Sequence, residues 1–305
     1  MHIMAASYIW LDGKMMPRER CKVDILTHSL QYGSGIFEGI REYNTDSGPR
    51  IFRLRDHVKR FFNSARICSM ELNISEREME DAIIETVKKN KLKECYIRPF
   101  AFYNDTSIGL STAGKKVSIA IAAVPFGNYF KDKEKGISCI VSSWRRINSQ
   151  ILPPQAKSSG HYRNSITASA EAKSLGANEA VLLDTNGYVA EGPGENIFLV
   201  KNSALVTPSE SSDILVGITR DSIIKLAEAF GIHVEERQVH REELYTCEEL
   251  FFTGTAAEIT TISKIDGRVV GKGVTGPVTR LLSSKFYEAA AGRLGAFTDW
   301  LTPVR

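Results

Sequence analysis

A glycine-rich turn carries two carboxylates that could do chemistry, Glu191 and Glu195. Gly192-Pro193-Gly194 separates them, and Glu195 precedes an apolar run at 197–200. Glycines let a backbone approach a ligand closely, and the apolar run predicts a buried strand. A carboxylate at this junction needs a cationic partner, because burial without one shifts its pKa and neutralises it. The partner could be a bound heterocycle, although the same string also fits a tight turn with a solvated glutamate.

Lys157 could act as a nucleophile or form a Schiff base. It lies in a run of small residues at 155–160 that contains no acid to pair with it. A lysine held in such a pocket can lose its proton and attack a carbonyl. A lysine in a loop is more often simply exposed, so both interpretations stay open.

Two further stretches could bind an anion through backbone amides. The run 215–221 leads into a predicted helix, whose first N–H groups have no intrahelical partner and favour an anion such as phosphate. Thr219 could cap that helix and bind the anion as well. The string 253–258, Thr-Gly-Thr-Ala-Ala-Glu, leaves room for amides to face a ligand. Plain N-capping and a tight turn are the alternatives.

Three side chains have the chemistry to bind acidic groups. Arg60 lies on a predicted helix, and a guanidinium can grip a phosphate through two parallel hydrogen bonds. Tyr96 and Arg98 fall on the same side of a predicted strand, where they could face an acidic substrate. Pro99 predicts that this strand lies at an edge or contains a bulge.

Strand-like and helix-like segments alternate along the chain. Predicted strands are 8–10, 35–43, 95–103, 117–124, 137–142, 179–184, 204–207, 233–237, 250–253 and 258–265, with a hairpin at the glycine-rich turn. Predicted helices are 55–70, one beginning at Ser75 with a capping box to Glu78, 165–175, 219–230 and 277–291. Hairpins among the helices favour an α+β fold with mixed sheets. We expect a small N-terminal domain over 1–130, a linker over 131–136 and a larger, cofactor-binding domain over 137–305.

The composition narrows the class of protein. The chain has 305 residues, 25% of them charged, and a net charge of only +3, which gives no argument for binding nucleic acid. No apolar run is long enough to span a bilayer, and no signal peptide is evident. Five scattered cysteines without a C-x-x-C pair argue against a zinc site and a disulfide framework. We therefore expect a cytoplasmic protein that binds neither metal nor membrane.

Six blocks in this order resemble the class IV (fold type IV) pyridoxal-phosphate aminotransferases, and among them the branched-chain amino-acid aminotransferases. The blocks are Tyr32–Arg41, Tyr96–Pro99, Ala156-Lys157, Glu191–Asn196, Gly217–Arg220 and Thr253–Glu258. The resemblance extends over nearly the whole chain. It implies two α/β domains, with the active site at the domain and dimer interface. It also implies transamination between Leu, Ile or Val and 2-oxoglutarate.

The resemblance also implies roles for individual residues. Lys157 would bind pyridoxal 5′-phosphate covalently and move the substrate proton, Glu195 would pair with the ring nitrogen, and Tyr162 would bind the phenolic oxygen. The cofactor, which becomes pyridoxamine 5′-phosphate in the half-reaction, would have its phosphate held by Arg60, Ile218, Thr219 and Thr255. The residues implied to contact substrate are Tyr32, Phe37, Gly39, Tyr96, Arg98, Leu110, Tyr129, Ala256 and Ala257.

Leu110 matches a residue that reaches the active site of a second subunit, which implies at least a homodimer. Two departures from the family pattern are Phe126, where tryptophan is common, and Pro193, where alanine is common. The same fold also hosts D-amino-acid and (R)-amine transaminases and aminodeoxychorismate-type lyases, which are the alternatives. The pattern Tyr96-x-Arg98-Pro99 with Phe37 and Gly39 favours the branched-chain enzymes. The presence of both Lys157 and Glu195 argues against a non-catalytic scaffold.

Overall fold

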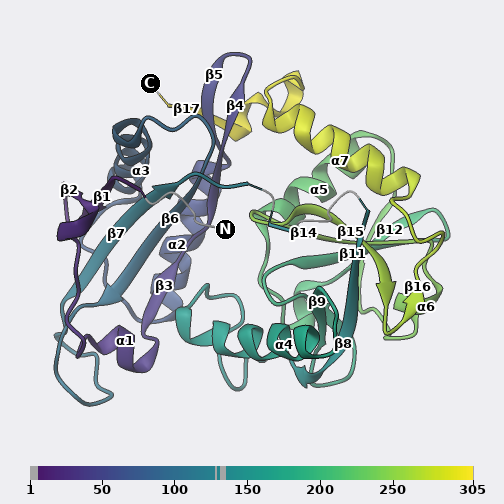
Figure 1. Cartoon of the computed structure of the whole chain (residues 1–305), viewed down its shortest axis with the longest axis horizontal. Coiled ribbons are helices and arrows are strands. Elements are labelled where there is room, and N and C mark those ends of the chain that lie inside the picture. The colour runs from purple at the N-terminus through teal and green to yellow at the C-terminus, as the bar shows by residue number, and fades with distance from the viewer. Residues whose placement is uncertain (1–5, 128, 131–134, 305) are drawn as a thin grey trace. The chain divides into compact units, whose positions relative to one another are not determined.

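The computed structural model describes residues 6–127, 129–130 and 135–304 (Figure 1). The described chain forms two compact units. Of the described residues, the first contains 6–127, 156–160 and 289–304, and the second contains 129–130, 135–155 and 161–288. The predicted domain boundaries at 130 and 137 stay a prediction, and most of the predicted linker, 131–134, lies outside the described residues.

The first unit is a sheet covered by helices. Its helices are α1 (His28–Tyr32), α2 (Leu54–Ile67) and α3 (Glu76–Asn90). Its strands are β1 (Tyr8–Leu11), β2 (Lys14–Pro17), β3 (Gly35–Phe37), β4 (Ile40–Thr45), β5 (Gly48–Phe52), β6 (Cys95–Tyr103), β7 (Val117–Val124) and β17 (Leu301–Pro303). The strand order is β17-β5-β4-β6-β7-β1-β2, with β3 beside β6, and the pairs among the described residues are antiparallel.

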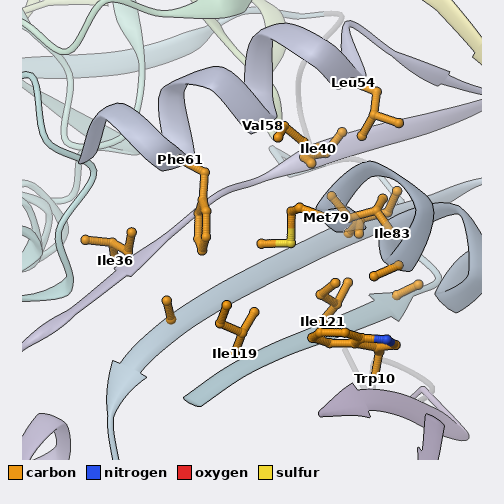
Figure 2. Close-up of a cluster of buried hydrophobic side chains, with 14 of the residues drawn as sticks. Trp10, Ile36, Ile40, Leu54, Val58, Phe61, Met79, Ile83, Ile119 and Ile121 are labelled. Atoms are coloured by element: carbon orange, nitrogen blue, oxygen red, sulfur yellow. The ribbon is translucent and has the colours of Figure 1, made fainter. Parts of the chain in front are cut away.

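The core of the first unit lies between this sheet and the helices α2 and α3. Figure 2 shows Phe61 of α2 and Met79 of α3 directed towards Ile119 and Ile121 of the sheet. Phe61 is 1% exposed, and burying a side chain of that size contributes about 1.5–3 kcal/mol. Helix α3 begins at the predicted cap, where Ser75 and Glu78 form both hydrogen bonds of the capping box. The core therefore fixes α2, which carries Arg60.

Pro99 lies inside a central strand, so the predicted edge position is wrong. Strand β6 pairs with β7 on one side and with both β3 and β4 on the other. The pairing with β4 ends at Ile97 and the pairing with β3 begins at Phe100, which leaves Pro99 opposite the break between the two short strands. Its missing N–H therefore costs no hydrogen bond of the ladder, and its carbonyl accepts one from the Glu38 amide at 2.9 Å.

The second unit is a mixed sheet with helices. Its helices are α4 (Tyr162–Ser174), α5 (Ile218–Ala229), α6 (Glu243–Thr246) and α7 (Pro277–Ala290), the last of which ends in residues of the first unit. Its strands are β8 (Ile137–Arg145), β9 (Glu179–Leu183), β10 (Val189–Glu191), β11 (Asn196–Lys201), β12 (Ala204–Pro208), β13 (Val234–Arg237), β14 (Glu249–Gly254), β15 (Glu258–Ile265) and β16 (Arg268–Val269). The order is β10-β9-β8-β15-β14-β11-β12-β13, with β16 beside β15. The β8–β9, β8–β15 and β12–β13 pairs are parallel.

The central strands of the second unit are buried on both faces. On β9, Ala180 and Leu182 pack with α4, whereas Val181 and Leu183 belong to the larger core. This alternation follows from the two-residue period of a strand, and it explains why β9 is apolar along its whole length. The mixture of sheets and helices in the chain is the predicted α+β class. No helix in the described ranges is long and apolar enough to cross a bilayer.

Candidate active site

Lys157 is attached to the first unit by its backbone. Its amide donates to Ser64 Oγ of α2 at 3.0 Å, and its carbonyl accepts from the Phe37 amide at 3.0 Å. The neighbouring Ser158 forms a bridge with Ile36, so the short segment 156–160 runs beside β3. Lys157 Nζ lies 5.2 Å from the centre of the Phe37 ring. The candidate nucleophile is therefore half-buried and held at a defined place, unlike an ordinary loop lysine.

Arg60 is held by a carboxylate that the sequence did not single out. Glu38, fully buried between β3 and β4, accepts from Arg60 Nε at 2.6 Å and from Arg60 Nη2 at 2.9 Å. His57 donates from Nδ1 to the same carboxylate at 2.8 Å. Although burial alone would raise the pKa of Glu38, Arg60 and His57 hold it well below its usual range. Burial lowers the pKa of His57, so a neutral ring donates to an ionised Glu38.

The candidate substrate residues of β3 and β6 lie together. Arg98 donates to the Tyr96 hydroxyl at 3.2 Å, and its guanidinium lies 4.6 Å from the centre of the Phe37 ring. A Cβ atom at Gly39 would collide with the Tyr96 hydroxyl oxygen, so a larger residue there would have to displace the Tyr96 side chain. Phe126 lies against Tyr96, with ring centres 4.9 Å apart and the ring planes tilted by 35°.

Tyr32 and Leu110 come close through one loop. The Gly109 amide donates weakly to the Tyr32 hydroxyl at 3.4 Å, and the Gly109 carbonyl lies 3.0 Å from His28 Nε2. Leu110, the next residue, is 81% exposed. Tyr129 belongs to the second unit, is 50% exposed and packs edge-on against Phe130.

Glu195 is 5% exposed and lies in the tight turn that joins β10 to β11. The Gly192 amide donates to the Glu195 carbonyl at 2.7 Å, and the Gly194 amide donates to its carboxylate at 3.0 Å. The predicted hairpin is wrong, because β10 pairs with β9 whereas β11 pairs with β12 and β14. The tight turn is present and the carboxylate is buried, which excludes the solvated glutamate. Gly254 lies beside it, because a Cβ there would approach the Gly194 carbonyl to 3.3 Å.

The string 253–258 forms the turn that joins β14 to β15. Gly254 pairs with Glu258, so the predicted tight turn exists and Thr255, Ala256 and Ala257 lie at its tip. Ala257 is buried, whereas Thr255 and Ala256 are half-buried. Since Asn196 of β11 pairs with Thr253, this tip and Glu195 occupy the same end of the sheet.

Helix α5 begins one residue earlier than predicted. Gly217 is its N-cap, no side chain caps it, and Thr219 lies inside the first turn, so the prediction of Thr219 as cap is wrong. The first amides of the turn remain without intrahelical acceptors, as the anion hypothesis requires. Asn196 Nδ2 donates to the Leu215 carbonyl at 2.9 Å, which ties the approach to α5 to the strand that follows Glu195.

Tyr162 is the first residue of α4 and is half-buried, although the helix was predicted to begin only at Ser165. The candidate residues therefore divide between the two units. The first unit contributes Lys157, Arg60 and the Tyr96 group, and the second contributes Tyr162, Glu195 and the α5 terminus. Within the first unit, Phe37 lies close to both Lys157 and Arg98. Within the second, the turn of Glu195 adjoins the turn at 253–258 and the approach to α5.

Several polar residues in these groups were missed or given no role. The residues are Glu38, His57, Arg146, Glu191 and Asn196. A signal existed for Glu38 and Glu191, since each is a carboxylate inside an apolar or glycine-rich run. The sequence contains no such signal for Arg146, because its partner Glu191 lies 45 positions further along the chain.

The chain matches known proteins over nearly its full length. The family model described as amino-transferase class IV matches residues 35–265. A curated branched-chain-amino-acid aminotransferase of Pseudomonas aeruginosa is 43% identical over 299 residues, covering 97% of each chain. A solved branched-chain amino acid aminotransferase from T.th. with pyridoxamine 5′-phosphate has a TM-score of 0.95 at 43% identity, covering 98% of this chain and 99% of that one. The same enzyme complexed with N-(5′-phosphopyridoxyl)-L-glutamate has a TM-score of 0.94 at 43% identity, with the same coverage. The chain therefore belongs to the class IV aminotransferase family.

Proposed function

We propose that this chain transfers the amino group of leucine, isoleucine or valine to 2-oxoglutarate with pyridoxal 5′-phosphate, giving branched-chain 2-oxo acids and L-glutamate. The single observation that carries the proposal is that the chain contains both a half-buried lysine, Lys157 in one unit, and a buried carboxylate, Glu195 in the other. The names of the relatives, and the ligands named with the solved structures, support the same reaction.

The residues fit the three chemical parts of the cofactor. Buried Glu195 suits a protonated ring nitrogen, which a carboxylate in a dry site favours. The first turn of α5 suits the phosphate, because Ile218 and Thr219 present amides there. Arg60 would add a guanidinium and Thr255 a hydroxyl. Tyr162 would donate to the phenolic oxygen.

When bound, pyridoxal phosphate supplies an electron-poor ring that stabilises the charge left on the substrate after its Cα proton is removed. Lys157 Nζ would remove that proton and later return it to C4′ of the cofactor. Glu195 would keep the proton on the ring nitrogen throughout, since burial makes its own carboxylate costly to leave unpaired. Near the Phe37 ring, the Lys157 amine has an aromatic face on one side.

For the substrate, we propose that Tyr96 and the amides of Ala256 and Ala257 bind the α-carboxylate. Tyr32, Phe37, Gly39 and Tyr129 would line the apolar pocket. Arg98 would bind the second carboxylate of glutamate, because its guanidinium already lies beside Phe37 and Tyr96.

We propose at least a homodimer in the cytoplasm. Four apolar side chains of the first unit are strongly exposed: Ile25 (77%), Leu30 (59%), Ile108 (78%) and Leu110 (81%). The two segments that carry them are joined, since the His28 amide donates to the Asp105 carbonyl at 2.7 Å. A second copy would cover such a surface. The cytoplasmic location is supported by five free cysteines.

The experiment is cofactor absorbance combined with a panel of amino donors. Lys157→Ala should abolish both the visible band of the bound cofactor and leucine-dependent glutamate formation, whereas Lys88→Ala, which alters an exposed lysine of α3, should change neither. An unchanged rate in Lys157→Ala would contradict the mechanism. Turnover of D-alanine or (R)-amines without turnover of leucine would favour the alternative enzymes of this fold.

The assembly is tested separately by light scattering. Leu110→Asp should weaken the dimer and lower activity, whereas Leu175→Asp, an equally charged change at a residue 67% exposed in the second unit, should do neither. A monomeric, fully active wild type would contradict the proposed dimer.

A further inference from the structure

The first carboxylate of the glycine-rich turn has a buried partner of its own. Arg146 Nε lies 2.8 Å from Glu191 Oε1, and the two side chains are only 7% and 6% exposed. The other oxygen, Glu191 Oε2, accepts from Asn196 Nδ2 at 3.0 Å and from the Leu215 amide at 3.1 Å. Arg146 therefore neutralises Glu191 while the carboxylate binds two further donors.

Glu191 and Asn196 together hold both backbone polar groups of Leu215. Glu191 accepts from the Leu215 amide, and Asn196 Nδ2 donates to the Leu215 carbonyl at 2.9 Å. Leu215 lies two residues before Gly217, the N-cap of α5. The three side chains thus form a clamp on the segment that leads into the helix. We call Arg146, Glu191 and Asn196 the Leu215 clamp.

Gly217 shows how closely the clamp fits. Its backbone angles, φ −77° and ψ 136°, are open to any amino acid, so backbone strain does not require glycine there. A Cβ atom at this position would, however, collide with Asn196 Oδ1. The contact with Asn196 therefore accounts for the glycine at the helix cap.

Resting on the proposed function, we propose that the Leu215 clamp positions the first turn of α5 for the cofactor phosphate. A helix terminus binds an anion only if its free amides point at it, and a displacement of about 1 Å can cost 100-fold in a preorganised site. Asn196 also directly follows Glu195, so the clamp fixes the spacing between the partner of the ring nitrogen and the amides for the phosphate. Glu191 and Asn196 act through the Leu215 backbone, and Arg146 acts through Glu191, so all three are positioning residues.

The test compares ligands that differ only in the phosphate. Apoprotein variants are titrated with pyridoxal 5′-phosphate and with pyridoxal, and inorganic phosphate is used as a competitor. Asn196→Ala should weaken pyridoxal 5′-phosphate binding by about 10- to 100-fold, while pyridoxal binding should change by less than about twofold. Asn178→Ala is the matched control, since Asn178 Oδ1 accepts from the Ser138 amide at 2.8 Å in the same unit. Among the described residues, its side chain makes no hydrogen bond with the approach to α5.

Gly217→Ala supplies a second variant that leaves all three clamp side chains in place. It should weaken pyridoxal 5′-phosphate selectively in the wild type and have little effect in the Asn196→Ala background, because the collision is then removed. An equal effect in both backgrounds would overturn the clamp.

A purely structural role would lower Tm and leave the ratio of the two ligand affinities unchanged, which would overturn the proposal. The two levels of inference can be separated. A wild type that binds no pyridoxal 5′-phosphate contradicts the proposed function itself. A wild type that binds it, with variants whose affinity ratio is unchanged, contradicts only the clamp.

Discussion

Replacing Glu38 with glutamine should destabilise the first unit strongly, and replacing Glu42 in the same way should not. Both glutamates are fully buried within the β3–β4 region. Glu38 is ionised and binds Arg60 and His57. Burial raises the pKa of Glu42 to about 7, although the Cys95 thiol donates to it at 3.0 Å. At pH 6 the Glu42 side chain is therefore mostly neutral, and glutamine is a close mimic of it.

The expected magnitude follows from the partners that each change leaves behind. Glu38→Gln leaves the Arg60 guanidinium, which is 14% exposed, without its carboxylate, and breaking a buried ion pair in this way costs about 3–5 kcal/mol. Glu42→Gln removes no charge at pH 6 and should cost less than about 1.5 kcal/mol. For a unit of about 150 residues, 1 kcal/mol shifts Tm by about 2–4 °C, so Glu38→Gln should lower Tm by roughly 6–20 °C.

The assay is calorimetry of the apoprotein at pH 6, repeated with saturating pyridoxal 5′-phosphate. If Arg60 binds the phosphate, the ligand supplies an anion, and the deficit of Glu38→Gln should shrink in the loaded protein. Equal Tm values for the two apoprotein variants would refute the account of Glu38 as the carboxylate that holds Arg60. A deficit that is unchanged by the cofactor would refute the role of Arg60 at the phosphate.

Three further predictions concern Glu42 and the candidate substrate pocket. The pKa of Glu42 is about 7 in the folded state, whereas that of a glutamate in the unfolded chain is about 4.3. The contribution of Glu42 to the free energy of unfolding is therefore largest at low pH and is lost as pH rises through 7. In urea unfolding, the free energy of unfolding of the wild type should therefore fall between about pH 5 and 8, by up to roughly 3 kcal/mol relative to that of Glu42→Gln. Parallel pH dependences of the two proteins would contradict this. Gly39→Ala should reduce kcat/KM for leucine by about tenfold or more with little change in Tm, since a Cβ would collide with the Tyr96 hydroxyl. An unchanged kcat/KM would show that the close contact between Gly39 and Tyr96 is not required for substrate binding. Arg98→Ala should lower kcat/KM of the glutamate half-reaction about 10- to 100-fold and that of leucine much less, whereas equal losses would disprove the dual-substrate role.

The fold could be predicted where the signal is local. Strands 95–103, 117–124 and 258–265 were predicted at their observed bounds, because each is a long apolar or alternating run between turns. The predicted strand 35–43 is instead two strands, β3 and β4, broken at Glu38 and Gly39. The pairing of β17 with β5 was not predicted, since it joins residues about 250 positions apart and no local pattern records it.

The sequence predicted which residues form the candidate site, but not which side chains hold those residues in place. Motif order could place Lys157 and Glu195, whereas the partners of Arg60 and Glu191 depend on which elements pack together. Glu38 lies 22 positions before Arg60, in the break between β3 and β4. A single sequence contains no distance between such elements, so the ion pairs could be found only in the structure.

The same arrangement recurs in both units. In the first unit, Arg60 keeps its charge because Glu38 binds two of its nitrogens. In the second, the charge of Glu191 is matched by Arg146, and the carboxylate can therefore hold the Leu215 backbone amide without adding a net negative charge. The two carboxylates of the glycine-rich turn thus differ in role although their sequence settings are alike. Each unit holds its groups by its own ion pairs and hydrogen bonds, and we expect the cofactor to gain affinity from interactions that need little rearrangement.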